Sequence, residues 1–272
     1  MLKSENKSKV ELHHCLANFL LSAQRTIILT GAGISTEAGI PDFRSPGTGL
    51  WEKLDSQKVF SAEAFTRHPE IFYQQGLKLL LTWQNAQPTK AHFFLARMEK
   101  KKIIRAIITQ NIDGLHQKAG SRKVYEIHGN LREGTCQNCY RKYPLKEILK
   151  KLPQQMPPRC DSCGEILKPD VVFFGDPLPE DFHRAEEEVI QSDFLWVIGS
   201  SLVVEPAASL PALALERGAK LAIVNLQPTP YEQQANLVIH SRIGETIDFL
   251  ESYIRLKTSY NEKEVRMSDY ND

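Results

Sequence analysis

The sequence predicts an α/β fold in which a doubly wound, mostly parallel sheet carries a smaller inserted domain. Short apolar runs rich in β-branched residues alternate with helical patterns along most of the chain, as they do in parallel sheets. The first of these runs is followed at once by Gly31 and Gly33. Two Cys-x2-Cys pairs interrupt the alternation within residues 134–170, which indicates a separate metal-binding module.

Length and composition are those of an ordinary globular chain. The 272 residues suffice for one large domain or two smaller ones. Lysine plus arginine (34) nearly balance aspartate plus glutamate (33), so no strong field favours nucleic acid or a membrane surface. No run approaches about 18 apolar residues, and no signal-peptide pattern is present. We therefore expect a cytoplasmic protein with no nucleic-acid or membrane partner.

The first elements are an amphipathic helix over about 9–23 and a strand over 26–29. Gly31-Ala32-Gly33 follows the strand, and Ser35-Thr36-Glu37 then supplies residues typical of a helix start. Glycines admit close backbone approach, and a helix N-terminus favours negative charge, so this unit predicts a pyrophosphate site. The third glycine of the usual fingerprint comes late, at Gly39, which leaves an ordinary strand-to-helix turn as the alternative.

The later elements repeat this alternation, with polar residues just past the strands. We expect strands over 103–109, 124–127, 194–198 and 221–224, and helical segments over 51–81, 91–101, 115–119 and 206–217. Four of the loops that follow strands are polar, namely 30–36, 110–113, 199–201 and 225–227. Because open α/β sheets bind ligands at the carboxyl ends of their strands, the sequence predicts a ligand crevice there.

The cysteine pairs predict a zinc site formed by Cys136, Cys139, Cys160 and Cys163. Two paired thiolates suit tetrahedral zinc, and four sulfur ligands leave no position for water, so the metal should be structural. Disulfides or redox pairs are the alternatives. An intracellular chain disfavours disulfides, and the presence of two matched pairs disfavours the redox interpretation.

Taken together, the motifs resemble the sirtuin family of NAD-dependent protein lysine deacylases, in particular its bacterial-type deacetylases. GAGIS, PDFR, TQNIDGLH, HG, FFGD and GSSLVVEP occur in family order around the two cysteine pairs, from about Val10 to Tyr253. The resemblance implies a discontinuous Rossmann-like NAD-binding domain and a small domain. The former comprises 1–44, 91–133 and 171–257, and the latter combines a helical insert at 45–90 with a zinc-ribbon module at 134–170. Residues 258–272 are expected to form a mobile tail.

The resemblance implies NAD-dependent removal of acetyl groups from protein lysines, with nicotinamide and O-acetyl-ADP-ribose as products. His128 stands at a strand end before Gly129 and matches the family's HG motif. It would take a proton from the ribose hydroxyls as general base, and Asn111 would orient the ribose and a water. Without the resemblance, a lone histidine is more often structural.

The implied binding residues come from every one of these motifs. For NAD they are Gly31, Ala32, Gly33, Thr36, Phe43, Arg44, Gln110, Ile112, Asp113, Gly199, Ser200, Ser201, Asn225, Gln227, Glu245 and Thr246. For the acetyl-lysine protein or peptide they are Val171, Phe173, Phe174, Gly175 and Val203. The peptide would pair as an extra strand between two segments of the chain. For Val171–Phe174 an ordinary apolar strand is the alternative.

One departure from the family bears on the acyl group. Members that prefer acidic acyl groups carry a Tyr-x-x-Arg pair, whereas this chain has Tyr73 followed by Gly76. A carboxylate would therefore enter a pocket that offers no cationic partner, unless Lys78 replaces the arginine. We expect acetyl and other neutral acyl groups to be preferred over succinyl or malonyl.

Three other functions are compatible with parts of the sequence. An NAD-dependent oxidoreductase would use the same cofactor but would produce reduced nicotinamide. A protein mono-ADP-ribosyltransferase would share the cleavage of NAD and differ only in its acceptor. A zinc-ribbon protein that binds nucleic acid without catalysis is disfavoured by the near-neutral net charge.

Overall fold

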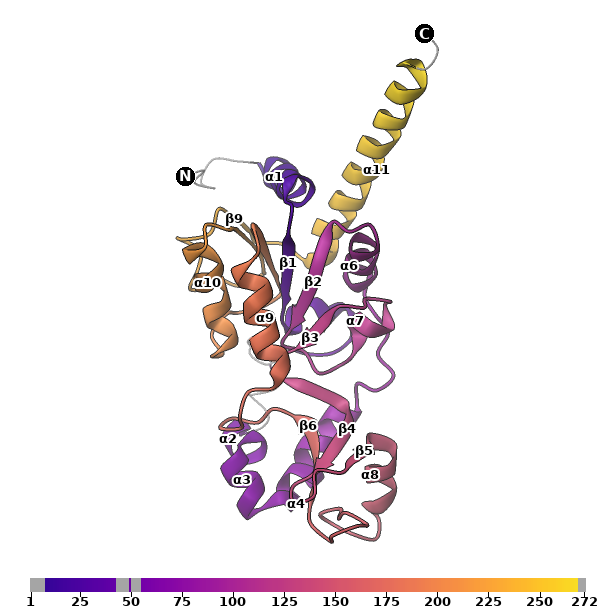
Figure 1. Ribbon diagram of the computed structural model, residues 1–272, viewed down its shortest axis with the longest axis vertical. Coiled ribbons are helices and arrows are strands. Elements are labelled where there is room, and N and C mark those ends of the chain that lie inside the picture. Colours follow the sequence, from indigo (N-terminus) through magenta and orange to yellow (C-terminus); the bar gives the residue numbers. More distant parts are fainter. Residues whose placement is uncertain (1–7, 43–48, 50–54, 269–272) are drawn as a thin grey trace.

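The computed structural model describes residues 8–42, 49 and 55–268, with the backbone alone for 258–268. A large lobe built on a parallel sheet lies beside a smaller lobe, and the C-terminal helix projects away from both (Figure 1). Phe43 and Arg44, two of the expected NAD contacts, lie outside the described residues.

The large lobe contains a six-stranded sheet in the order β3-β2-β1-β7-β8-β9, and each neighbouring pair is parallel. Its strands are β1 (Thr26–Thr30), β2 (Ile104–Thr109), β3 (Val124–Glu126), β7 (Phe194–Ile198), β8 (Lys220–Val224) and β9 (Leu237–Ile239). The doubly wound parallel sheet is confirmed, and its first five strands agree with the predicted ranges to within one residue. The short edge strand β9 was not predicted.

Helices cover both faces of the sheet because the strands are apolar on both sides. One face packs on α1 (Lys9–Ser22), α6 (Lys90–Lys100) and α11 (Ile243–Ser268). The other packs on α9 (Glu180–Ile190) and α10 (Leu210–Glu216). Within β1, Ile28 faces the first layer and Ile27 and Leu29 face the second, as the two-residue period of a strand requires.

The small lobe joins two parts of the chain around one apolar core. An antiparallel sheet, β5-β4-β6, is formed by β4 (Gly129–Cys136), β5 (Lys142–Pro144) and β6 (Leu167–Val171), with α8 (Leu145–Lys151) packed against it. The earlier part consists of α2 (Ser56–Phe60), α3 (Ala62–Arg67), α4 (Pro69–Ile71), the π-helical turn η4 (Phe72–Leu77) and α5 (Lys78–Leu81). Side chains of both parts share the core, so the helical insert and the cysteine module form one lobe. The exact domain boundaries stay a prediction.

Several local features differ from the predicted ones. The glycine turn leads into a 3₁₀-helix, η2 (Ala32–Ala38), that begins directly after Gly31, so Ser35-Thr36-Glu37 lies inside the helix and not at its start. The predicted helix at 206–217 is a 3₁₀ turn, η5 (Ala207–Ser209), followed by α10. Helix α11 extends to Ser268, into the stretch predicted to be a tail, whose mobility stays a prediction.

Helix α7 (Leu115–Lys118) follows β2 after a polar loop, as predicted. No helix in the described part of the chain is long and apolar enough to cross a lipid bilayer.

Candidate functional site

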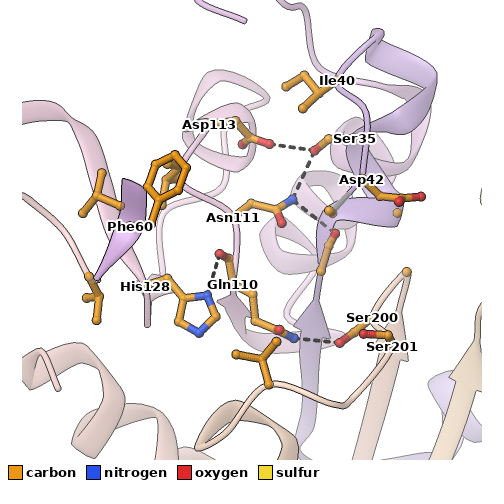
Figure 2. Close-up of a pocket in the computed structure, with 18 of the residues that line it drawn as sticks. Ser35, Ile40, Asp42, Phe60, Gln110, Asn111, Asp113, His128, Ser200 and Ser201 are labelled. Atoms are coloured by element: carbon orange, nitrogen blue, oxygen red, sulfur yellow. Dashed lines mark hydrogen bonds between the residues drawn. The ribbon is translucent and has the colours of Figure 1, made fainter. Parts of the chain in front are cut away.

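A cavity lies where the two lobes meet, at the carboxyl ends of the parallel strands. It encloses about 570 Å³, a volume typical of sites for small ligands. The loops after β1, β2, β7 and β8 all contribute to its wall, so the predicted crevice is present. Figure 2 shows polar side chains of the loops after β1, β2 and β7 converging on the cavity.

Most of the predicted NAD contacts line this cavity. They are Gly31, Ala32, Gly33, Gln110, Ile112, Asp113, Gly199, Ser200, Ser201, Asn225 and Gln227. The two residues expected to act in catalysis, Asn111 and His128, line it as well. Residues more than 190 positions apart in the sequence thus meet at one site.

The glycines of the first loop allow it to pack closely on the loop after β7. A Cβ atom on Gly33 would lie 2.7 Å from Gly199 Cα, and one on Gly31 would lie 2.7 Å from the Gly199 oxygen. The N–H groups of Gly31 and Gly33 donate to the carbonyls of Ile198 and Gly199. These two donors are therefore already used within the protein.

Ser35 links two polar residues of the site. Its hydroxyl donates to Asp113 Oδ2 over 2.7 Å and accepts a hydrogen bond from Asn111 Nδ2 over 3.1 Å. Asn111 Nδ2 also lies 3.2 Å from the Gly31 carbonyl oxygen, to which it donates (Figure 2). These bonds fix the orientation of the Asn111 amide. The Asp113 carboxylate accepts a second bond from the Leu115 N–H over 2.9 Å.

Burial raises the pKa of Asp113, and the hydrogen bonds from Leu115 and Ser35 oppose this rise because they favour the charged form. Protonation of the Asp113 carboxylate would weaken its ability to accept these two hydrogen bonds. Asp113 is therefore a buried carboxyl group whose charge depends on its hydrogen-bond donors.

His128 is oriented by the backbone of the loop after β2. Its Nδ1 lies 3.0 Å from the Gln110 carbonyl oxygen, and because a carbonyl can only accept, Nδ1 carries a proton. The acceptor nitrogen of the neutral ring is then Nε2. The side chain of Gln110 donates to Ser200 Oγ over 2.8 Å, which connects the β2 and β7 loops beside the histidine (Figure 2).

The other side of the cavity is apolar and belongs mainly to the small lobe. Phe60, Leu80 and Trp83 contribute from the helical insert. Of the predicted substrate contacts, Val171, Phe173, Phe174 and Gly175 line the cavity, whereas Val203 lies outside the lining and is 52% exposed. No lysine or arginine occurs among the described residues of the wall.

The apolar pattern of segment 171–174 allowed one continuous strand, but in the structure the segment is not continuous. Strand β6 ends at Val171, and Phe174 then makes an isolated parallel bridge with Ser61. The Phe174 N–H donates to the Phe60 carbonyl over 2.8 Å, and the Ala62 N–H donates to the Phe174 carbonyl over 2.9 Å. The bridge holds this wall of the cavity against the helical insert.

Three predicted NAD contacts in the described residues lie apart from the cavity lining. Thr36 is exposed, and its hydroxyl donates to the Gly33 carbonyl. Glu245 pairs with Lys9. Thr246 is fully buried and lies 3.1 Å from His13 Nε2 and 2.7 Å from Ser241 Oγ. Their roles stay predictions.

Tyr73 and Gly76 also lie outside the cavity lining, which corrects their assumed place in the acyl pocket. Tyr73 is 3% exposed, and its hydroxyl donates to the Leu167 carbonyl. A Cβ atom on Gly76 would lie 2.8 Å from Val59 Cγ1 and 3.2 Å from Phe60. Gly76 is therefore packed one layer behind Phe60, and Lys78 is exposed.

The four predicted metal ligands come together in the small lobe. The sulfur atoms of Cys136, Cys139, Cys160 and Cys163 all lie within 4.8 Å of one another. The Cys136–Cys163 and Cys139–Cys160 pairs are 3.4 and 3.5 Å apart, too long for a disulfide. A tetrahedral zinc with Zn–S bonds of about 2.3 Å requires sulfur separations of about 3.8 Å. The cluster fits a structural zinc ion, and it lies outside the cavity wall.

The sequence did not identify several cavity residues. The sequence predicts Ser35 as a helix-start residue, and it gives no indication that Phe60, Leu80 and Trp83 face a ligand. The loop after the glycine turn also adds Ile40, Pro41 and Asp42. Pro41 and Asp42 belong to the PDFR motif, which the sequence analysis identified. For the aromatic residues no such signal exists, because no local pattern distinguishes an aromatic residue of a cavity wall from one of a core.

Comparisons with known proteins identify relatives of this chain. The model of the Sir2 family matches residues 31–206. The chain is 52% identical over 227 residues to NAD-dependent protein deacetylase 2 of Caldanaerobacter subterraneus subsp. tengcongensis, covering 83% of this chain and 89% of that protein.

Solved structures show the same fold. A complex of Sir2 with a p53 peptide and NAD+ superimposes with a TM-score of 0.80 at 40% identity, covering 89% of this chain and 97% of the other. A structure of Sir2 bound to an acetylated peptide gives a TM-score of 0.80 at 39% identity, covering 90% and 98%.

Proposed function

The chain belongs to the Sir2 family, and we propose that it is an NAD-dependent protein-lysine deacetylase in which His128 is the general base. In this reaction the ribose carbon of NAD would lose nicotinamide, the remaining ADP-ribose would take up the acetyl group, and one water would be consumed to release the free lysine. The observation that carries the proposal is the position of His128 in one cavity with Asn111, Asp113 and the glycine turn.

His128 is suited to remove a proton from a ribose hydroxyl. Its Nδ1–H donates to the Gln110 carbonyl, so the ring presents Nε2 as its acceptor and keeps one orientation. An imidazole has an ordinary pKa of about 6.5, which allows proton abstraction near neutral pH. The histidine lies at the junction of β3 and β4, where the two lobes meet, within reach of ligands from both.

Asn111 and Asp113 define the end of the cavity that holds the nicotinamide and its ribose. Asn111 is 6% exposed and is oriented by Gly31 and Ser35, and such an amide positions a ribose or a water without moving itself. Asp113 is a hydrogen-bond acceptor for a carboxamide. Because the nucleophile is a neutral amide oxygen, positioning and the exclusion of water account for most of the rate enhancement.

The acetyl-lysine peptide enters between the two lobes. Phe174, which lines the cavity, and Val203, which lies outside its lining, are apolar side chains that are 38% and 52% exposed. A peptide strand between them pairs through its main chain, so the target sequence has little influence on binding. The acyl group reaches the wall formed by Phe60, Leu80 and Trp83.

We propose neutral acyl groups as substrates because the described wall of the cavity has no lysine or arginine. A carboxylate on the acyl chain would be desolvated without a cationic partner, which costs several kcal/mol. Acetyl-peptide should therefore be turned over faster than succinyl-peptide of the same sequence. Faster turnover of the succinyl-peptide would contradict this proposal.

Mass spectrometry of an acetylated peptide incubated with the protein and NAD tests the function. Deacetylation makes the peptide lighter, whereas mono-ADP-ribosylation makes it much heavier, and an oxidoreductase would produce reduced nicotinamide instead. His128→Ala should abolish deacetylation with the zinc content unchanged. The matched control is His183→Ala, because His183 is exposed on α9, where it pairs with Glu186 and contacts the ring of Phe182. Wild-type rates in His128→Ala would refute the assignment of the base.

A cytoplasmic location is also part of the proposal. It is supported by the four clustered thiols, which bind zinc only when reduced, as cytoplasmic thiols are. Cell fractionation with detection of the chain would test it.

A further inference from the structure

Two buried histidines outside the cavity lining lie between the helices α6 and α7. His92 is 0% and His116 is 1% exposed, and their ring centroids are 4.7 Å apart. Burial lowers the pKa of His92 to about 4 and that of His116 well below its ordinary value. Both rings are therefore neutral, and each carries a single N–H.

The hydrogen bonds of His92 fix the position of its proton. The Thr89 N–H lies 3.2 Å from His92 Nδ1 and donates to it, so Nδ1 is an acceptor and the proton is on Nε2. The single proton of the Thr89 hydroxyl has two acceptors within reach, His92 Nδ1 at 2.8 Å and the Ile34 carbonyl oxygen at 3.2 Å. Thr89 thus caps α6 and holds η2, the helix that carries the first cofactor loop.

The position of the proton on His116 follows from two threonines at the ends of β1 and β2. The Thr30 hydroxyl donates to Thr109 Oγ1 over 2.9 Å, so it accepts from His116 Nε2, which is 3.0 Å away. His116 therefore carries its proton on Nε2, and its Nδ1 is an acceptor. Thr109 Oγ1 also accepts from the Asn111 N–H over 3.1 Å.

One donor and one acceptor then remain on adjacent rings. His92 Nε2 and His116 Nδ1 are both inaccessible to solvent and have no hydrogen-bond partner among the described residues. A buried donor and a buried acceptor that lack a hydrogen-bond partner would each destabilise the fold by about 1–3 kcal/mol. Native structures pair such groups with each other or through ordered water. Their complementary character identifies them as partners.

We propose that one water accepts from His92 Nε2–H and donates to His116 Nδ1, and so completes a chain of hydrogen bonds from Thr89 to Asn111. His92, His116 and Thr30 are then positioning residues. The chain holds η2 at the Ile34 carbonyl and the β2 loop at the Asn111 N–H, so it fixes the distance between the two loops that face the nicotinamide ribose. This role rests on the proposed function, since it concerns the same site.

Two isosteric substitutions on one strand test the role in activity. Thr30→Val removes the hydroxyl that joins His116 to Thr109. Thr26→Val removes an equally buried hydroxyl, 0% exposed, that has no partner among the described residues. We expect Thr30→Val to lower kcat/KM for NAD about tenfold or more, because catalysis is sensitive to small displacements. Thr26→Val should stay within about twofold of the wild type. Equal effects of the two changes would overturn the proposal.

A second measurement requires no activity. Nitrogen-15 NMR of the histidine rings at pH 7 should show both His92 and His116 neutral and protonated on Nε2, with ring N–H groups that exchange slowly. Thr30→Val should shift the His116 signals and Thr26→Val should not. A charged ring, or a proton on Nδ1 of either histidine, would refute the chain even if the enzyme were active. If the NMR result held and the protein did not deacetylate, the proposed function alone would fail.

Discussion

Replacing Ser35 by alanine should disable the site with little effect on the fold. The Ser35 side chain is fully buried and joins Asn111 to Asp113 through its hydroxyl. Alanine removes one oxygen and introduces no clash. The substitution leaves Asp113 with one fewer donor and leaves Asn111 bound to Gly31 alone among these contacts.

The expected magnitude follows from the kind of bond that is lost. A hydrogen bond to a charged group contributes about 1.5–3 kcal/mol. If all of this free energy stabilises the transition state, its loss should lower kcat/KM by between about 10-fold and about 150-fold. Loss of the Ser35 donor also raises the pKa of Asp113 further, since that bond opposes the effect of burial. The acid limb of the pH–rate profile should therefore move to higher pH.

Release of nicotinamide, measured with saturating acetyl-peptide and varied NAD from pH 5.5 to 8.5, would check both expectations. Ser121→Ala is the matched control because Ser121 is buried and its hydroxyl has no partner among the described residues. The control should match the wild type in rate and in pH profile. If Ser35→Ala stayed within about twofold of this control, the hydroxyl would not orient the catalytic groups.

Three further changes probe the site and its supports. Asp113→Asn should abolish most activity yet raise the free energy of unfolding at pH 7, because a carboxyl whose pKa is raised by burial destabilises the fold when ionised. Denaturant titrations should show this gain shrinking as the pH falls through the raised pKa of the folded state and disappearing well below about 4, where the wild-type carboxyl is protonated in both states. Gly33→Ala should lower the free energy of unfolding by about 1–3 kcal/mol, because its Cβ would lie 2.7 Å from Gly199 Cα; thermal unfolding and NAD titration would measure it. Cys139→Ser should remove bound zinc and loosen β4, β5 and β6 while the parallel sheet keeps its amide protection, measured by metal analysis and hydrogen exchange.

The sequence predicted the parallel strands well because each is a short run of β-branched residues between turn residues. It also predicted which loops meet, because parallel strands present their carboxyl ends at one edge of the sheet. The zinc ligands were predictable from spacing alone, since few other structures need two Cys-x2-Cys pairs. These features depend on local patterns and on the alternation of elements.

The features that were not predicted depend on contacts between segments distant in the sequence. Ser35 is typical of a helix start, and only its distance to Asp113 shows that it joins two loops. Phe60 lies in a predicted helical segment. It becomes part of the cavity wall because the segment that follows β6 pairs with it at Phe174. The hydrogen bonds from the N–H groups of Gly31 and Gly33 to Ile198 and Gly199 also join distant segments, and the sequence does not show them.

The register of the sheet explains how four loops form one site. Thr30 lies opposite Thr109 on one side and Ile198 on the other, and Ile198 lies opposite Val224. Four adjacent strands therefore end at the same level.

The bonds of the site then connect different loops. Gly33 donates to Gly199, Asn111 to Gly31, and Gln110 to Ser200. A slip of one residue between two strands would exchange the faces of every side chain on one of them and would move its loop by about 3.3 Å. That displacement exceeds the length of each of these hydrogen bonds. The apolar layers on both faces of the sheet therefore fix the geometry of the site as well as the stability of the fold.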